Sequence, residues 1–402
     1  MDNMKKESNT RQLRFTNKPL LIMTLIYAAL GAFLILDASF ISATLTYGAD
    51  SPYFFFTRQL FWIGVSFIVA IIVLFFPTKI YRKISGFLVP VIMIGLVAYF
   101  VYNNAFTSGV SDVTLGNVQI SEFMKVAMIV YMGSYYGSWV NKKHSGYKSI
   151  SIINGIRPLI IAALAFLIVL FGGDFGSASI MLALFALIFI SVPCNEKYFK
   201  VIKGIAIGGM ITAVLVLKFG YLVIPQKVLE SDYRLTRFIY KNPCDRYESV
   251  SGYQVCNGYI AIDNGGLVGS GISNSVQKYL YLPESHTDFI FPIIVEEFGV
   301  LFGIAILVGY MAIAYFTFKI ATNCYELQNS IICYGIGIYF LLHIFVNLGG
   351  VLGIIPLTGV PLPFLSYGGS YCLCTIVSFA IVQRINIENQ IEKRARERKN
   401  NN

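Results

Sequence analysis

Long apolar stretches separated by short polar segments recur along the chain. Ten of them approach the length that a helix needs to cross a bilayer, which is about 20 residues. They lie at about 20–38, 57–76, 85–103, 122–140, 157–171, 178–194, 202–225, 287–318, 330–350 and 370–384. The pattern predicts an all-α polytopic membrane protein with about ten transmembrane helices.

Composition supports this interpretation. Hydrophobic residues make up 56% of the 402 positions and charged residues only 13%, and a soluble domain cannot bury that much apolar surface. The net charge of +10 would suit a nucleic-acid-binding protein, but the basic residues are scattered as anchors rather than gathered along one groove. Nucleic acid is therefore not expected as a partner.

The basic residues also predict the orientation of the spans. With ten spans and a cytoplasmic N-terminus, most of the 31 Lys and Arg residues fall on the inside, as the positive-inside rule requires. We therefore expect both termini in the cytoplasm. The expected organisation is a basic segment at 1–18, a single transmembrane domain at 19–385 and a basic tail at 386–402.

One predicted outer segment, 226–286, is unusually long and rich in Gly, Asn and Ser. A loop of that length in a compact membrane protein is usually functional. Cys244 and Cys256 both lie in it, on the oxidising side of the membrane. They either pair or remain two free thiols, and the sequence does not decide between these alternatives.

Ionisable residues at membrane depth are costly, so each is a functional candidate. The residues concerned are Arg58, Glu122, Lys125, Asp174, Asp288, Glu296 and Glu297. All except the two adjacent glutamates lie at or near the predicted outer face. Their convergence predicts a polar cavity that opens outward.

Asp288 lies where the long outer segment becomes the eighth span. An aspartate at this place is either a helix N-cap, which meets the positive end of the helix dipole, or a general base. The spacing alone favours the cap. The two roles are compatible, because the dipole would keep the carboxylate ionised.

The other acidic candidates each have a simpler structural interpretation. Glu122 and Lys125 are three residues apart on one helix face and would form a local salt bridge. Asp174 lies in a glycine-rich turn, where aspartate is common. Glu296 and Glu297 lie about two turns into the eighth span, where pairing with buried donors would account for them.

The segment 356–370 contains three prolines and three glycines and cannot form a lipid-exposed helix. Irregular backbone at this depth must pack within the protein or line a cavity. Thr358, Ser366, Tyr367 and Ser370 would offer hydroxyl groups there. A purely structural re-entrant loop is the alternative.

This segment, PLTGVPLPFLSYGGS, resembles the C-terminal signature of the SEDS family of cell-wall proteins, which includes FtsW, RodA and SpoVE. Further similar motifs are YLPESHTDFIFPIIVEEFG (281–299), NLGG (347–350), SGYQVCNGYIAIDNGGLVGSGISNS (251–275), SEFMK (121–125) and RQLFW (58–62). The resemblance covers almost the whole chain. The short spacing at 274–284 is more similar to the FtsW branch than to the RodA branch.

The resemblance implies a peptidoglycan glycosyltransferase whose substrate is lipid II, a disaccharide-pentapeptide on undecaprenyl diphosphate. It implies that Asp288 is the general base on the acceptor sugar and that transfer inverts the anomeric centre. Glu122 and Lys125 match the Glu and Lys of the family motif PSE-x-x-K. Asp174 matches the Asp of the motif PD-[LF]-G-[ST], and Arg58 matches the arginine that opens the second span.

Contacts to the diphosphate or the sugars are expected from several of these segments: Arg58, Lys125, Glu122, Asp174, Lys278, His286, Thr358, Ser366 and Ser370. A divalent cation, Mg²⁺ or Mn²⁺, held by Glu122 or Asp174, would share in neutralising the diphosphate. No other cofactor is expected.

The sequence departs from the family pattern at three places. Asp112 stands where tryptophan is usual, Gly173 replaces a proline and Pro292 replaces an alanine. These differences affect the expected geometry of the third outer loop and the cavity mouth, but they leave Asp288 in place.

The resemblance also implies partners and a location. A class B penicillin-binding protein with one transmembrane helix, other divisome proteins and membrane lipid are the expected partners. The protein is expected in the bacterial plasma membrane at the division septum, with its active site facing outside. A sporulation or elongation role stays open, as do two other functions, a lipid II flippase and a non-catalytic membrane scaffold for a cell-wall transpeptidase.

Overall fold

The computed structural model describes most of the chain. The described residues are 13–45, 47–106, 114–115, 118–138, 140–141, 146–147, 152–193, 197–223 and 240–401. Asp112 and the part of the long outer segment before Tyr240 lie outside these residues.

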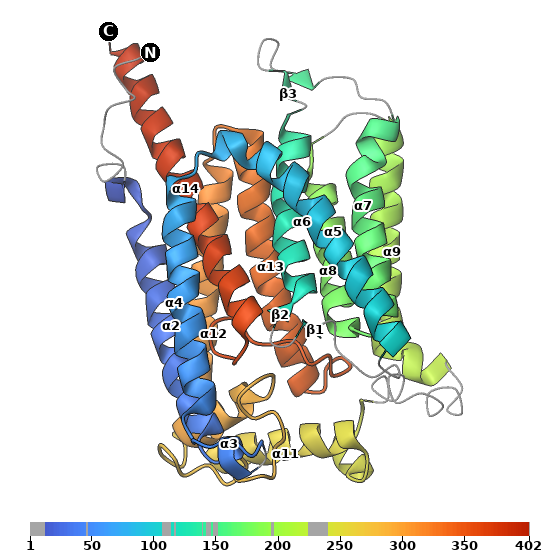
Figure 1. The fold of residues 1–402 in the computed structure, drawn as a ribbon, viewed down its shortest axis with the longest axis vertical. Coiled ribbons are helices and arrows are strands. Elements are labelled where there is room, and N and C mark those ends of the chain that lie inside the picture. Colours follow the sequence, from blue (N-terminus) through green and yellow to red (C-terminus); the bar gives the residue numbers. More distant parts are fainter. Residues whose placement is uncertain are drawn as a thin grey trace.

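Ten long helices in the described part of the chain correspond one to one to the ten predicted stretches (Figure 1). They are α2 (Lys18–Ser39), α4 (Phe54–Phe75), α5 (Tyr81–Phe106), α6 (Ile120–Gly137), α7 (Ile152–Phe171), α8 (Phe175–Ser191), α9 (Lys197–Val223), α12 (Ile290–Thr322), α13 (Leu327–Val351) and α14 (Gly369–Asn400). Eight of them are long and apolar enough to cross a membrane. The other two are α6, which carries polar residues, and the shorter α8. The predicted all-α membrane fold is confirmed.

The remaining elements are short. They are η1 (Leu13–Phe15), α3 (Ser42–Leu45), η2 (Thr78–Ile80), η4 (Pro243–Arg246), α11 (Val250–Gly265), and the strands β1 (Thr114–Leu115), β2 (Val118–Gln119), β3 (Val140–Asn141) and β4 (Gly146–Tyr147). The strands form two antiparallel hairpins, β1 with β2 and β3 with β4. The helices α3 and α11 lie at the end of the bundle opposite both described chain ends (Figure 1).

The helices pack with α13 near the centre of the bundle. It contacts α6 and α8 on one side and α12 and α14 on the other. Most residues of α13 and α14 are buried, whereas few residues of α4 and α9 are. Their outward side chains are large and apolar, such as Ile68 on α4 and Ile205 on α9. Such an outer surface is suited to lipid, which is the environment that the composition predicts.

The helix α14 runs from the predicted last span into the predicted basic tail without interruption. The predicted boundary at 385/386 therefore falls inside one continuous helix. Its middle binds the start of the chain, since Gln383 Nε2 donates to the Asn17 carbonyl over 3.0 Å and Asn386 Nδ2 donates to the Phe15 carbonyl over 2.7 Å. Both described chain ends consequently lie at the same end of the bundle (Figure 1).

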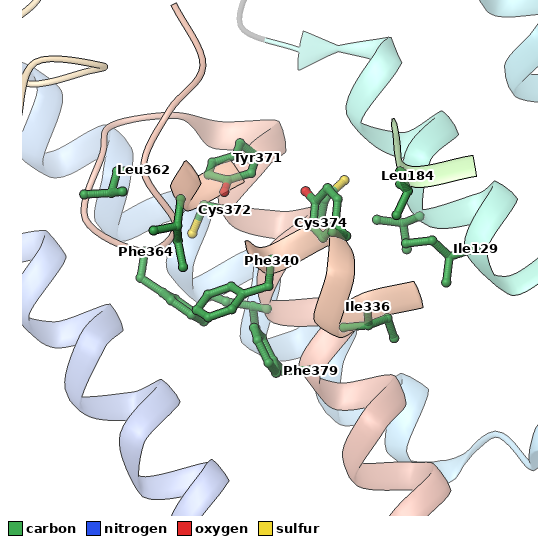
Figure 2. Close-up of a cluster of buried hydrophobic side chains, with 14 of the residues drawn as sticks. Ile129, Leu184, Ile336, Phe340, Leu362, Phe364, Tyr371, Cys372, Cys374 and Phe379 are labelled. Atoms are coloured by element: carbon green, nitrogen blue, oxygen red, sulfur yellow. The ribbon is translucent and has the colours of Figure 1, made fainter. Parts of the chain in front are cut away.

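The irregular segment 356–370 between α13 and α14 is packed inside the protein. Gly359 and Phe364 both have positive φ angles, +69° and +65°, which fold the segment back on itself. The Tyr310 hydroxyl of α12 donates to the Pro363 carbonyl over 2.5 Å. Leu362 and Phe364 are buried in a cluster with Phe340 of α13, as Figure 2 shows. The segment thus reaches membrane depth with protein around it, as its composition requires.

The helix α12 is broken near its start, which the predicted continuous span did not anticipate. Gly299 has a φ of +84° and a ψ of +165° inside the helix, a conformation that favours glycine. The outer segment docks at this break, because Ser270 N donates to the Glu296 carbonyl and Gly271 N donates to the Glu297 carbonyl, each over 2.9 Å.

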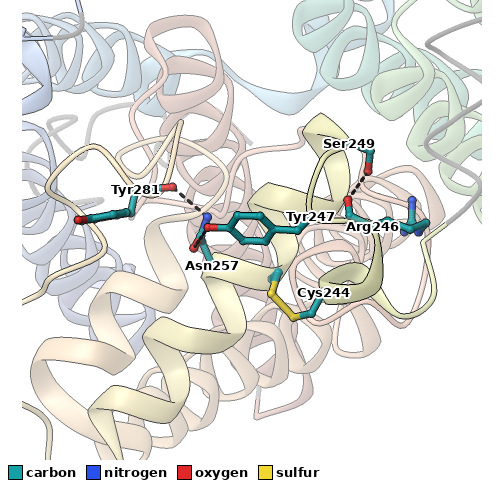
Figure 3. Close-up of a disulfide and its surroundings, with 7 residues drawn as sticks. Cys244, Arg246, Tyr247, Ser249, Asn257 and Tyr281 are labelled. Carbon is teal, nitrogen blue, oxygen red and sulfur yellow. Dashed lines mark hydrogen bonds between the residues drawn. A yellow bond between two sulfur atoms is a disulfide. The ribbon is translucent and has the colours of Figure 1, made fainter.

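A disulfide joins η4 to α11 within the outer segment. Cys244 and Cys256 are bonded (Figure 3), which settles the alternative left open by the sequence. Next to it, Asn257 accepts a hydrogen bond from the Tyr247 hydroxyl over 3.3 Å and donates to the Tyr281 carbonyl over 3.1 Å. The two halves of the described outer segment are therefore tied together.

Candidate active site

Asp288 lies in a tight turn immediately before α12. The Glu284 carbonyl accepts hydrogen bonds from the backbone N–H groups of Thr287 and Phe289, over 3.1 and 3.2 Å. This turn delays the helix, which begins at Ile290 with Phe289 as its N-cap residue. The prediction that Asp288 caps the helix is therefore wrong. Its side chain instead accepts a hydrogen bond from the Thr287 hydroxyl over 3.1 Å and is 9% exposed.

Asn347 of α13 holds the backbone of Asp288 against the irregular segment. Its Nδ2 atom donates to the Asp288 carbonyl over 2.9 Å and to the Val360 carbonyl over 2.7 Å. The Asp288 carboxylate faces the same segment, since a Cβ atom at Gly359 would lie 3.8 Å from Asp288 Oδ2. The structure thus brings Asp288 and the segment 356–370 together. Sequence reasoning missed Asn347. The feature that could have revealed it is a polar amide side chain inside an otherwise apolar span.

His286 supports this turn from inside an aromatic cluster. Its ring is 2% exposed and lies 4.2 Å from the Phe55 ring and 5.8 Å from the Tyr367 ring, measured between centroids. Its carbonyl accepts a hydrogen bond from Tyr367 N over 2.9 Å. Burial lowers the pKa of His286 to about 4, although the charge of Glu284 opposes the shift. The ring is thus neutral at physiological pH and offers no positive charge to a diphosphate.

Among the described residues, Arg58 is a cation at the same end of the bundle as Asp288. It is exposed on the first turns of α4, with its guanidinium carbon 4.0 Å from the centre of the Phe54 ring. It also interacts with the side chain of Tyr367, whose ring is tilted by 51° against the His286 ring. An exposed guanidinium next to the Asp288 turn is well suited to bind an oxyanion.

Asp174 is a helix cap that also ties three segments together. Its carboxylate accepts from Ser177 N over 2.9 Å as the N-cap of α8, and from Gln119 Nε2 over 2.6 Å. Gln119 N in turn donates to Ser370 Oγ over 3.1 Å. The Thr358 carbonyl packs on the same helix start, since a Cβ atom at Gly176 would lie 2.6 Å from it. Asp174, Ser370 and Thr358 therefore meet, through a glutamine that sequence reasoning missed.

Glu122 and Lys125 form an enclosed ion pair. Lys125 Nζ donates to Glu122 Oε1 over 2.5 Å, and the two residues are 0% and 1% exposed. The local salt bridge expected from their spacing is confirmed. The expectation that both side chains line an outward cavity is wrong, because they lie in the interior of the bundle between α6 and α13.

Lys278 is also neutralised, at a different place. Its ammonium group donates to both carboxylate oxygens of Asp37, over 2.9 and 2.8 Å, and to Glu297 over 2.6 Å. Burial acts to lower the pKa of Lys278, but the hydrogen bonds and charges of the two acids outweigh it and raise that pKa. The group lines a cavity of about 310 Å³ between α2 and the outer segment. Lys278 thus joins α2 to α12.

Two further predicted residues have internal roles. Ser366 Oγ accepts a hydrogen bond from Leu362 N over 2.8 Å within the irregular segment. Glu296 accepts bonds from the outer segment, from Val276 N and Asn264 Nδ2, each over 3.1 Å. The expectation that Glu296 and Glu297 pair with buried donors is confirmed.

The two carboxylates expected to hold a divalent cation do not fit one. Glu122 already binds Lys125 and the Tyr339 hydroxyl, the latter over 3.1 Å. Both oxygens of Asp174 accept hydrogen bonds. Within the residues that the structure describes, no three His, Cys, Asp or Glu side chains converge as metal ligands. The cation stays a prediction of the sequence, and no step below depends on it.

Comparison with known proteins places this geometry in context. The family model for FtsW, RodA and SpoVE, described as "Cell cycle protein", matches residues 18–391. The Bacillus subtilis (strain 168) protein named "Probable peptidoglycan glycosyltransferase FtsW" is 34% identical over 385 residues, which cover 94% of this chain and 92% of the relative. Stage V sporulation protein E of the same organism is 29% identical over 372 residues, covering 91% and 95%.

Two solved structures share the fold. A chain from a structure described as "Structural coordination of polymerization and crosslinking by a peptidoglycan synthase complex" has a TM-score of 0.66 at 18% identity, covering 93% of this chain and 98% of that one. The crystal structure of the rod shape determining protein RodA of Thermus thermophilus has a TM-score of 0.60 at 17% identity, covering 93% and 97%.

Proposed function

Because the chain belongs to the FtsW, RodA and SpoVE family of cell cycle proteins, we propose that it is a peptidoglycan glycosyltransferase that polymerises lipid II into β-1,4 glycan strands. The relatives named as peptidoglycan glycosyltransferases match nearly the whole chain. The single observation that carries the chemical part is the placement of Asp288 immediately before α12. Asn347 ties its backbone to the segment 356–370, and its carboxylate faces Gly359 of that segment.

Asp288 acts as the general base in this proposal. Its carboxylate takes the proton from the 4-hydroxyl of the acceptor N-acetylglucosamine while the hydroxyl oxygen bonds to the anomeric carbon of the donor. The bond from that carbon to the diphosphate breaks at the same time, and the electron pair leaves with undecaprenyl diphosphate. Attack from the opposite face converts an α-linked donor into a β-linked product. Positioned base catalysis of this kind contributes about 10²–10⁴-fold.

Arg58 is the leading residue for the diphosphate. A diphosphate is a good leaving group, so stabilisation of its charge replaces an acid catalyst. Lys125 and Lys278 each already bind carboxylates, whereas the Arg58 guanidinium is exposed at the same mouth as Asp288. Arginine binds phosphate oxygens in a planar, bidentate manner.

The protein is a multi-pass bacterial membrane protein, and we propose the finer placement from its charges. The end of the bundle that carries α11 and Asp288 faces the outside, and the basic chain ends face the cytoplasm. A class B penicillin-binding protein is the proposed partner, supported by the fold shared with a peptidoglycan synthase complex. Relatives include FtsW proteins and a sporulation protein alike. The proposal that this protein acts at the division septum therefore rests on the short spacing at residues 274–284, which is similar to that of the FtsW branch.

The test is glycan synthesis by the purified full-length protein given lipid II in detergent. We expect polymer from the wild-type protein and a loss of about 10²–10⁴-fold for Asp288→Asn. Normal synthesis by this variant would exclude Asp288 as the base. A flippase has nothing to transport in detergent, so a wild-type protein that makes no glycan with its partner present would favour the transport alternative.

A further inference from the structure

Three polar side chains follow one face of α13. Tyr339, His343 and Asn347 are spaced four residues apart, so they project from the same side of the helix on successive turns. All three are buried. Buried polar groups in a membrane-spanning helix are costly unless they find partners. The partners of this set, here called the α13 stripe, therefore indicate what it holds.

The first two members of the α13 stripe bind the enclosed ion pair of α6. The Tyr339 hydroxyl donates to Glu122 Oε2 over 3.1 Å, and His343 Nε2 lies 3.4 Å from Lys125 Nζ. An ammonium group has only donors, so this ring nitrogen is the acceptor and the neutral ring carries its proton on Nδ1. The His343 ring also stacks on the Tyr371 ring at the start of α14, with 4.6 Å between the centroids. The ion pair is thereby connected to the helix start that directly follows the irregular segment.

The third member fixes that same segment to Asp288. An asparagine amide has two N–H donors, and Asn347 uses both on main-chain carbonyls, those of Asp288 and Val360. The two bonds originate from a single planar group. They therefore set the distance between the Asp288 peptide and the Val360–Pro361 backbone.

We propose that His343 and Asn347 are positioning residues for Asp288, and that Glu122 and Lys125 act on the reaction through the α13 stripe rather than by touching the substrate. This inference rests on the proposed role of Asp288 as the base. Lys125 is fully enclosed and its charge is already balanced by Glu122, and the contacts of this pair with His343 and Tyr339 join it to α13. A base displaced by about 1 Å costs about 100-fold in rate.

The experiment measures initial rates of glycan synthesis by the purified full-length protein as a function of lipid II concentration. For Asn347→Leu we expect kcat to fall about 100-fold with KM unchanged. A lower kcat with an unchanged KM is also expected for Lys125→Met. The matched control is Asn329→Leu, because Asn329 is a buried amide on the same helix whose Nδ2 bonds Thr78 at the other end of the bundle, over 3.5 Å. This control should keep the wild-type kcat.

A second pair of variants separates positioning from loss of folding. His343→Gln keeps an acceptor for the Lys125 ammonium group and should retain activity, whereas His343→Leu has none and should lose kcat. If Asn347→Leu does not fold, Asn347→Asp replaces it, because it has the same shape but lacks the two donors.

The outcomes distinguish the inference from the proposed function. If Asn347→Leu and His343→Leu keep the wild-type kcat while Asp288→Asn is inactive, the positioning role of the α13 stripe is wrong and the role of Asp288 as the base stands. A raised KM for lipid II in Lys125→Met, with kcat unchanged, overturns the positioning role too, because Lys125 would then bind substrate. Full activity of Asp288→Asn would instead show that Asp288 is not the general base, and the proposed function would lose its catalytic residue.

Discussion

Gly31 of α2 lies directly against the main chain of Phe364: a Cβ atom at position 31 would come 2.0 Å from the Phe364 carbonyl oxygen. The obstacle is backbone, and Phe364 is itself held at a positive φ, so it cannot move aside as a flexible side chain would. We expect Gly31→Val to push the segment 356–370 away from α2. The free energy of unfolding should fall by about 1–3 kcal/mol, measured by thermal unfolding in detergent.

Gly64 of α4 supplies the control for this substitution. It also lies within a membrane-spanning helix, but among the described residues no neighbouring atom is within 4 Å of a Cβ built there. Gly64→Val should leave the midpoint of unfolding close to that of the wild type. Equal midpoints for the two variants would contradict the close packing of α2 on the irregular segment.

Lys278 is expected to stabilise the fold rather than bind the diphosphate. Lys278→Met leaves two carboxylates, the half-buried Asp37 and the buried Glu297, facing each other without their cation. Breaking a buried ion pair from one side costs about 3–5 kcal/mol. Adding Asp37→Asn and Glu297→Gln to Lys278→Met should restore most of that stability and the glycan synthesis lost with it.

The kinetic readout decides between the two roles of Lys278. A diphosphate ligand would show a raised KM for lipid II that neutralising the acids does not repair. Thermal unfolding together with initial rates, on the single and the triple variant, gives both quantities from one preparation.

The bond between Cys244 and Cys256 is expected to stabilise the outer segment. It closes a short loop, with a sequence separation of 12 residues, for which a disulfide contributes about 2–4 kcal/mol. The double variant Cys244→Ser/Cys256→Ser should therefore unfold at a lower temperature. Dithiothreitol should lower the wild-type midpoint to the same value and leave that of the variant unchanged. Cys324→Ser, at a free cysteine, should respond to the reductant as the wild type does.

His286 is expected to make the protein less stable in mild acid. Burial lowers the pKa of His286 from 6.5 to about 4. Between these values the unfolded chain binds a proton that the folded chain does not, so the free energy of unfolding falls as the pH decreases from about 6.5 to about 4. The full effect is about 3 kcal/mol. Above pH 6.5 the ring is neutral in both states and adds no pH dependence.

His286→Phe isolates this effect, because a phenyl ring keeps the contacts with Phe55 and Tyr367 but cannot bind a proton. The wild type should lose more stability than the variant between about pH 7 and about pH 5, as followed by denaturant or thermal unfolding. The carboxyl groups titrate in the same range in both proteins, so only the difference between them reports on His286. An identical loss would mean that the folded and unfolded chains protonate this ring equally.

The spans were predictable because apolar length is a local property of the chain. Each of the ten long helices follows from about twenty neighbouring residues, and the salt bridge of Glu122 and Lys125 follows from a spacing of three. The composition of 356–370 likewise excluded a lipid-exposed helix. These features needed no knowledge of which helices are neighbours.

The errors arise where distant segments meet. The cap at Asp288 was expected from spacing, but the Glu284 carbonyl takes the Phe289 N–H group and delays the helix start. Asn347 bonds residues 59 and 13 positions away, and Gln119 joins Asp174 across 55. No periodicity or local motif encodes such pairs. Lys125 was wrongly expected to line an outward cavity for the same reason, because the sequence does not show that α13 covers this side chain.

The uninterrupted course of α14 has a mechanical consequence. A helix of 32 residues is about 48 Å long. This one carries Ser370 near its start and, near its other end, Arg394, which lies over the Phe15 ring. A stiff rod with both ends engaged transmits any axial shift or rotation along its length. A binding event that moves the tail would thus displace the Ser370 hydroxyl, which accepts a hydrogen bond from Gln119 N at the opposite end of the bundle.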